Sequence, residues 1–173
     1  MGVSNIASGG IILVVLVVVL MTMPKLLDST LLLQDASTQI TDLEDSITKT
    51  EINVNTISAP TTNSDEISFS IDNNGEEKLW NFEKFNVIIT YDPASGKVTE
   101  SLSFAGDCDV GQPTQGMWCN DGITTDLLDP DILNSGESMA VRATVASDFA
   151  TGAAIVVVST DNGIIGTDSV AVP

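Results

Sequence analysis

The chain opens with an apolar segment in which the first 24 residues carry no charged side chain. The stretch from Ile6 to Met23 is uncharged and rich in Ile, Leu and Val. A helix of about 18 residues, rising 1.5 Å per residue, nearly crosses the ~30 Å hydrocarbon layer of a bilayer. The pattern therefore predicts a transmembrane helix over residues 1–24. The side chains expected to anchor it are Ile6, Ile11, Leu13, Leu16, Val19, Met23 and Lys25.

Two other interpretations of this segment remain open. A secretory signal peptide starts with a basic region and ends at a small-residue cleavage site, whereas here the flank is MGVSN and the segment ends in MTMP. A filament subunit would instead pack its apolar helix into a bundle with other copies. We expect the segment to be retained in the membrane, with a filament-core helix as the second interpretation.

A second hydrophobic pattern follows Pro24 and has a period of seven residues. Its members are Leu26, Leu33, Ile40, Ile47 and Val54, with Leu43 and Ile57 in the intermediate position. This spacing predicts a helical stalk over residues 25–55. The stripe is narrow, so two interpretations remain open: it packs on the chain's own domain, or it mediates self-association. The self-association stripe would consist of Leu26, Leu33, Ile40 and Ile47.

Alternation with period two replaces the helical pattern after a Ser-, Thr- and Pro-rich linker at 56–65. DPASGK and DNG are turn sequences that predict hairpins between neighbouring strands. Short strands at this spacing indicate an immunoglobulin-like antiparallel β-sandwich over residues 66–173, and hence a mainly β fold class. The expected strands are 67–71, 85–91, 98–104, 137–145, 153–160 and 164–172, with a seventh around Ile123–Leu128.

The two cysteines, Cys108 and Cys119, flank a Gly- and Pro-containing loop. A disulfide between them would stabilise the fold by roughly 2–3 kcal/mol and would fit an extracytoplasmic compartment. Two reduced thiols or half of a metal site are the alternatives. A structural zinc site lacks ligands here, because the chain has two Cys and no His.

Charge and composition narrow the function. The chain has 6 Lys+Arg against 24 Asp+Glu, a formal net charge of -18, and no His. Nucleic acid would be repelled by such a protein. The Ser-His-Asp and Cys-His constellations cannot form without histidine, so we expect a non-enzymatic protein without cofactor.

Acidic pairs raise the question of calcium. Asp107 with Asp109, Asp126 with Asp129, and Asp129 with Asp131 could supply oxygen ligands, although none matches an EF-hand loop. A solvated acidic surface is the favoured interpretation, and no metal site is expected.

Three aromatic residues, Trp80, Phe82 and Phe85, cluster in KLWNFEKFNV. They cannot all face the core of one short strand. Packing beneath the preceding turn is favoured over an exposed aromatic patch.

Several segments together resemble a known group of proteins. MGVSNIASGGIILV leads into one N-terminal apolar helix, ISFSIDNNGEEKLWNFEKFNVIITYD resembles a first hairpin, and ILNSGESMAVRATV and VVSTDNGIIGTDSVAV follow near the end. In this order they are similar to the archaellin-like membrane proteins of archaea, in particular the F-type and G-type accessory proteins of the archaellum, the archaeal swimming motor.

The resemblance implies a single-pass protein of the cell membrane with its C-terminal sandwich outside the cell. It implies a stator-like role, with the surface-layer protein, other archaellum accessory proteins and membrane lipid as partners, and with homo- or hetero-oligomers. Archaellin and type IV pilin-like precursors carry a basic residue and Gly before the apolar run. Here only Met1 precedes Gly2, which argues against processing into a filament. A filament subunit stays the alternative function.

Overall fold

The computed structural model describes the backbone of residues 3–58, 60–108, 113–126 and 129–173. In helix α1 and strand β1 it also leaves the side chains of residues 3–13, 19–20, 22–30 and 56–57 undescribed. The chain divides into two compact units, Met1–Glu44 and Asp45–Pro173.

Helix α1 runs without a break from Val3 to Lys49. Its backbone stays helical through Pro24, where the sequence predicts the end of a separate span. Among the residues that the structure describes, no helix combines the length and the hydropathy that a membrane crossing requires.

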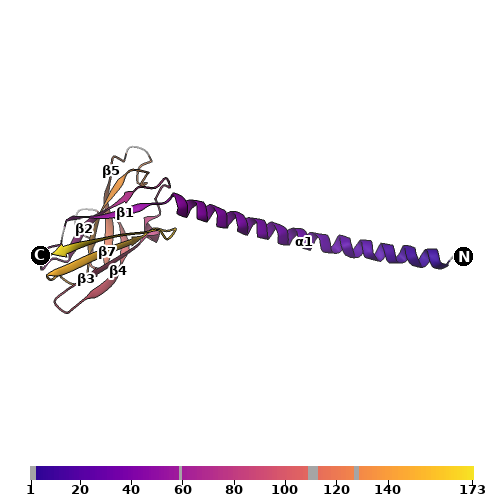
Figure 1. The fold of residues 1–173 in the computed structure, drawn as a ribbon, viewed down its shortest axis with the longest axis horizontal. Helices are drawn as coiled ribbons and strands as arrows, with labels where there is room; N and C mark the ends of the chain where they lie inside the picture. Colours follow the sequence, from indigo (N-terminus) through magenta and orange to yellow (C-terminus); the bar gives the residue numbers. More distant parts are fainter. Residues whose placement is uncertain (1–2, 59, 109–112, 127–128) are drawn as a thin grey trace. The chain divides into compact units, whose positions relative to one another are not determined.

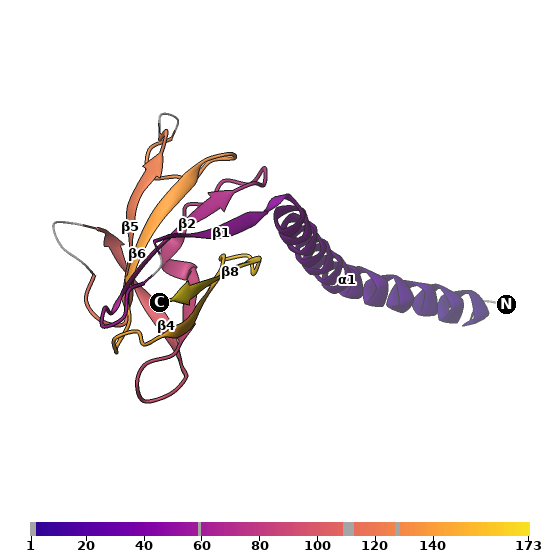
Figure 2. The ribbon, with the colours of Figure 1, turned by 60° about the vertical axis from the view of Figure 1, so that its left-hand side comes forward.

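In the described residues of the second unit, eight strands follow one another in a single hydrogen-bonded order, β1-β2-β6-β5-β4-β3-β7-β8. Figure 1 draws the strands as arrows. Figure 2 shows β5, β6, β2 and β1 fanned side by side. A short 3₁₀ turn, Phe82–Lys84, precedes β3. The strands are β1 Ile52–Ser58, β2 Glu66–Asn73, β3 Asn86–Tyr91, β4 Val98–Asp107, β5 Met117–Thr124, β6 Ser138–Thr144, β7 Gly152–Ser159 and β8 Ile165–Val172.

Strand β4 belongs to both halves of this sheet. Its first half pairs antiparallel with β3, up to Leu102 opposite Val87. Its second half, from Ser103, pairs parallel with β5. The prediction of an antiparallel two-sheet sandwich is therefore wrong in this detail, because β4 crosses from one layer to the other and joins them into a near-barrel.

The two end strands approach each other without a hydrogen-bonded ladder between them in the described strands. Gly166 in β8 makes the approach possible. A Cβ built at this position would lie 2.8 Å from Cγ2 of Val54 in β1. The missing side chain thus lets β8 close the near-barrel against β1.

Strand β1 occupies residues for which the sequence predicts the end of the helical stalk and part of the linker. The helical assignment of residues 52–55 is wrong. Val54 fits the seven-residue spacing, but it also alternates with Ile52, and both side chains are buried in the core. Pairing of β1 with β2 decides between the two patterns, because it buries this face.

Alternating apolar side chains of both layers fill the core, as period-two strands require. Trp118 is fully buried, with its ring centroid 4.5 Å from that of Phe104. The largest fully buried side chains are Trp118, Tyr91, Phe69, Phe149, Ile67 and Ile71.

Tyr91, the chain's one tyrosine, connects the core to a loop. Its hydroxyl donates to Oε1 of Glu100 at 2.6 Å and accepts from the backbone N–H of Ser147 at 3.2 Å. The other carboxylate oxygen of Glu100 accepts from the N–H of Ala146 at 3.0 Å. Burial, followed by the hydrogen bond and charge of Glu100, raises the pKa of Tyr91 to about 12.

This raised pKa predicts a stability loss in alkali. Because the unfolded pKa is about 10, the contribution of neutral Tyr91 is fully present below pH 10 and is lost as pH rises through about 12. A tyrosinate absorbance titration should therefore have its midpoint near 12 in the native protein and near 10 in denaturant. In the Glu100→Gln variant the native midpoint should fall but stay above 10, because burial remains. A native wild-type midpoint at 10 would contradict the contact.

Candidate functional site at the end of helix α1

The last turn of α1 is fastened to the sandwich by backbone hydrogen bonds, all within the unit Asp45–Pro173. The carbonyl of Lys49, which a free helix end would leave to water, accepts from the N–H groups of Glu76 at 2.7 Å and Glu77 at 3.2 Å. Two residues further along the chain, the carbonyl of Glu51 accepts from Asn74 at 2.8 Å and Gly75 at 3.0 Å. The loop after β2 therefore caps the helix end.

Gly75 is the point of closest approach in this cap. A Cβ built there would lie 2.3 Å from the Lys49 carbonyl oxygen and 2.5 Å from the backbone nitrogen of Glu51. Both are backbone atoms that cannot rotate away. Glycine at this position lets the loop after β2 and the segment after α1 come into contact.

The β7–β8 turn holds the helix end through one side chain, Asn162. Its Nδ2 donates to the hydroxyl of Thr50 at 2.6 Å and to that of Ser46 at 3.2 Å. Its Oδ1 accepts from the hydroxyl of Thr160 at 2.5 Å, which fixes the amide orientation. Thr50 also donates to the carbonyl of Ser46 at 2.8 Å. The DNG sequence predicts only a hairpin turn, but this turn also binds the end of α1.

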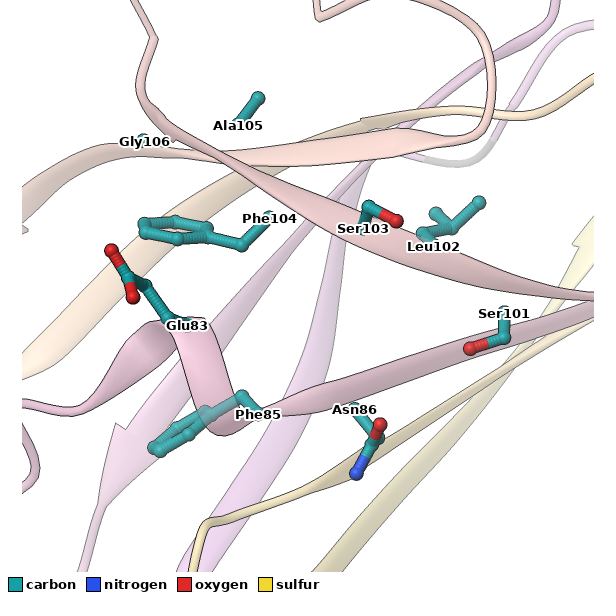
Figure 3. Close-up of a pocket in the computed structure, with 9 residues that line it drawn as sticks. All are labelled: Glu83, Phe85, Asn86, Ser101, Leu102, Ser103, Phe104, Ala105 and Gly106. Atoms are coloured by element: carbon teal, nitrogen blue, oxygen red, sulfur yellow. The ribbon is translucent and has the colours of Figure 1, made fainter.

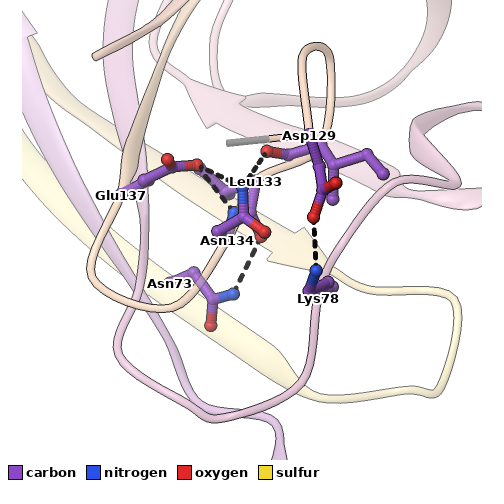
Figure 4. A network of polar contacts seen from close by, with 7 residues as sticks. Asn73, Lys78, Asp129, Leu133, Asn134 and Glu137 are labelled. Carbon is purple, nitrogen blue, oxygen red and sulfur yellow. Dashed lines mark hydrogen bonds and ion pairs between the residues drawn. The ribbon is translucent and has the colours of Figure 1, made fainter. Parts of the chain in front are cut away.

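The buried side chain of Asn73 holds the capping loop by hydrogen bonds. Its side-chain nitrogen donates to the carbonyls of Glu77 at 2.7 Å and Leu133 at 3.0 Å, and its oxygen accepts from the N–H of Gly75 at 3.1 Å. Figure 4 shows Asn73 beside the loop that carries Leu133 and Asn134. This amide therefore joins the loop after β2 to the segment around Leu133, 60 residues further along the chain.

Two further contacts hold the loop facing Asn73 (Figure 4). Oε2 of Glu137 accepts from the backbone N–H of Asn134 at 2.8 Å and from its side-chain nitrogen at 3.1 Å. Lys78 forms an ion pair with Asp129. These contacts place the Leu133 carbonyl where Asn73 binds it.

The charge at the helix end matches the helix dipole. Lys49 donates to Asp45, one turn earlier, at 2.6 Å. This hydrogen bond and the charge of Asp45 raise the pKa of Lys49, with Glu76 and Glu77 adding smaller contributions. A cation in the last turn interacts favourably with the partial negative charge there.

The predicted anchor and stripe residues lie mostly on α1. Of the anchor residues, Leu16 is described and exposed, whereas the side chains of Ile6, Ile11, Leu13, Val19, Met23 and Lys25 lie outside the described residues. Of the stripe residues, Leu33 and Ile40 are exposed and Ile47 is 38% exposed. The side chain of Leu26 is not described. Anchor and stripe remain predictions.

The disulfide between Cys108 and Cys119 is confirmed, with Cα atoms 5.1 Å apart. It joins the end of β4 to β5 and closes the loop between them. The backbone N–H of Cys108 donates to the carbonyl of Asn120 at 2.7 Å. On the chain-entropy estimate, a loop of this length contributes roughly 3 kcal/mol.

The predicted acidic pairs are not brought together as a cation site in the described part of the chain, where no group of three acidic, Cys or His side chains could hold a metal. Asp109 lies outside the described residues. Asp129 pairs with Lys78, and Asp107 accepts from Asn120 at 3.1 Å. Asp126 and Asp131 line a shallow depression with Asp107.

The aromatic cluster divides between core and surface. Phe82 and Phe85 are buried, with ring centroids 5.4 Å apart. Trp80 is 64% exposed. The favoured expectation of packing beneath the turn is therefore right for the two phenylalanines and wrong for the tryptophan.

An open groove of about 630 Å³ lies where β3 and β4 diverge. Figure 3 shows the rings of Phe85 and Phe104 on its apolar side and the side chains of Glu83 and Asn86 near its rim. The groove follows from the exchange of partners by β4, since beyond Leu102 this strand no longer pairs with β3.

Sequence reasoning missed Asn73, Gly75 and Asn162, the residues that fasten the helix end. Each lies in a turn sequence, DNNG or DNG, that was interpreted as a turn alone. Asn and Gly are common in turns for local reasons. Their presence there does not indicate whether the residue also contacts a segment that is distant in sequence. No local signal could have found them.

Comparisons with known proteins give similar folds at low sequence identity. No protein-family model and no curated protein matches the chain. The archaellum periplasmic stator protein FlaG from Sulfolobus acidocaldarius is similar with a TM-score of 0.47 and 12% identity, covering 69% of this chain and 100% of that one. The stator complex of FlaF and FlaG from the same organism gives 0.48 and 13%, covering 68% and 88%.

A third solved structure, a β-glucosidase from Listeria innocua in complex with glucose, gives a TM-score of 0.32 and 16% identity, and covers 71% of this chain and 16% of that one. The first two structures are archaellum stator proteins, the group that the sequence also resembles. The TM-scores of these three structures lie below 0.5, so the similarities carry no functional conclusion about this chain.

Proposed function

We propose that this protein is a non-enzymatic, membrane-anchored accessory component of the archaellum. In this role its apolar N-terminal segment lies in the cell membrane, and its sandwich binds the surface layer outside the cell. The protein then serves as a fixed point against which the motor turns. Other archaellum accessory proteins are its expected neighbours.

The observation that carries the proposal is the fastened end of α1. A junction bonded at several points resists bending more than a single covalent connection does. Here the Lys49 carbonyl is capped by the loop after β2, and Ser46 and Thr50 are bound by Asn162. Water could satisfy the same groups at a free helix end, so bonds to the sandwich favour a stiff junction.

One further feature supports an external position, and two others fit an anchored protein with an acidic body. The disulfide Cys108–Cys119 fits an oxidising compartment. The net charge of -18 keeps the sandwich soluble and argues against anionic partners such as nucleic acid. The uncharged stretch 6–23 has the length of a span.

Fractionation of the full-length protein tests the anchor. We expect the wild-type chain to stay with membranes after carbonate extraction, with residues 1–24 intact by mass spectrometry. The double variant Val14→Lys/Val17→Lys should be released, because each Lys at the centre of a span costs about 3 kcal/mol. The matched control, Thr38→Lys/Thr41→Lys, adds the same charge outside the apolar run and should stay bound.

Release of the wild-type chain by carbonate would contradict the anchor. A native chain trimmed near its start and recovered in sheared filaments would instead favour a filament subunit. Capture of surface-layer protein by the detergent-solubilised full chain tests the partner separately. A membrane-bound chain that captures none would keep the anchor and overturn the proposed surface-layer binding.

A further inference from the structure

Helix α1 exposes a row of apolar side chains in its second half. Leu33, Ile40 and Leu43 are 70%, 58% and 53% exposed. They recur at steps of seven and three residues, which places them on one side of a helix. In heptad notation (abcdefg), Leu33 and Ile40 both occupy position a, and Leu43 occupies position d. The other d position in this stretch is Ala36, whose small side chain permits close approach of a second helix.

Two acidic residues of the same segment, Asp35 and Asp42, lie away from this side, whereas Glu44 flanks it. Asp35 and Asp42 each follow an a residue by two positions, which turns them about 200° around the helix from the seam. The positions that flank the seam carry Ser37, Gln39 and Glu44. Only one of these three is charged, although the chain as a whole has a net charge of -18.

This separation matters because two copies of a strongly acidic protein repel each other. Like charges beside a helical seam would oppose pairing. Placing Asp35 and Asp42 on the far side, where water and salt screen them, removes much of that repulsion.

We propose that α1 forms a parallel two-stranded coiled coil with a second copy of this chain, through Leu33, Ala36, Ile40 and Leu43. Ile at a followed by Leu at d, as at Ile40 and Leu43, favours two strands. The inference uses the helix residues alone and is independent of the proposed function. Leu32 flanks the seam, and Leu31 stays outside it.

The parallel orientation follows from the chain on either side of the seam. In a parallel pair, the exposed apolar residues 14–18 of both copies lie at the same end. An antiparallel pair centred on the seam would instead place these residues opposite residues 58–62 of the partner, beyond the end of its helix. The apolar side chains of the two copies would then lie at opposite ends of the pair and could not cover each other.

Disulfide trapping in the full chain tests this arrangement. Single variants Leu33→Cys and Ile40→Cys are oxidised mildly in detergent and run on non-reducing gels, with Asp35→Cys and Asp42→Cys as matched controls. Because equivalent a positions face each other only in a parallel pair, both seam variants should yield at least about tenfold more cross-linked dimer than the controls. Equal yields, no dimer, or dimer at only one seam position would overturn the proposal.

A second measurement does not depend on cysteine chemistry. Sedimentation of Ile40→Asp should show self-association at least tenfold weaker than wild type, because a charge enters the seam. Thr38→Asp adds the same charge on the outer side and should leave association within about twofold of wild type. A monomeric wild-type chain, or equal weakening by both substitutions, would overturn the coiled coil.

Discussion

Replacing Asn73 by Asp is expected to lower the free energy of unfolding by about 3–5 kcal/mol at neutral pH. The substitution keeps the shape of the side chain but exchanges its nitrogen for oxygen. That nitrogen now donates to the carbonyls of Glu77 and Leu133, so an aspartate would set a buried negative charge against two acceptors. The N–H of Gly75 alone would still bind it. Urea unfolding followed by tryptophan fluorescence measures the loss.

The pH dependence of this variant identifies the cause. Burial next to two carbonyls raises the pKa of the introduced carboxyl above its usual value of about 4. The folded state then takes up the proton before the unfolded state does, so the deficit shrinks as pH falls through the raised pKa towards 4. A deficit that does not change with pH would indicate a packing fault rather than a buried charge.

Asn86→Asp is the matched control for this prediction. Asn86 is exposed in β3, so the same exchange of nitrogen for oxygen adds a solvated charge. We expect a change within about 0.5 kcal/mol. Equal effects at Asn73 and Asn86 would show that Asn73 does not organise the loop.

The hairpins were predictable because their signals are local. DPASGK joins β3 to β4 and DNG joins β7 to β8, both with the antiparallel pairing that turn chemistry and alternation indicate. The same holds for the alternating run at 67–71, which lies inside β2. In each case a few consecutive residues carry the information.

The parallel pair of β4 with β5 could not be predicted in this way. Its cause is the position of Trp118 in the core beside Phe104, across a loop closed by the disulfide. The sequence around Cys119 reads as a loop because Gly and Pro precede it, and the expected seventh strand was placed too late. Strand β5 begins at Met117, and only its end overlaps the predicted Ile123–Leu128.

The candidate site lay further beyond prediction, since the bonds that join the helix end to the sandwich connect segments distant in sequence. The sequence predicts helix through residue 55, whereas α1 ends at Lys49. The hydrogen-bond partners of the last turn of α1 depend on where β2 and β8 lie after folding. A heptad pattern could not reveal that β1 starts at Ile52, three residues after Lys49, because Val54 satisfies both periods.

The fastening of the helix end makes Gly75 the other position of large expected effect. Gly75→Ala should lower the free energy of unfolding by about 2–4 kcal/mol, since its Cβ would collide with the backbone of Lys49 and Glu51. The loop after β2 must then withdraw, and the Lys49 carbonyl loses Glu76 and Glu77 as donors. Hydrogen exchange at those two amides should accelerate together with the loss of stability.

Gly96→Ala separates this clash from the general cost of replacing glycine. Gly96 has a φ of +107° and nothing within 4 Å of a built Cβ, so its substitution carries backbone strain alone, about 1 kcal/mol. Exchange at Glu76 and Glu77 should be unchanged in that variant. If Gly75→Ala cost no more than Gly96→Ala, the loop would yield easily. The end of α1 would then be a flexible junction, which would remove the main support for the proposed function.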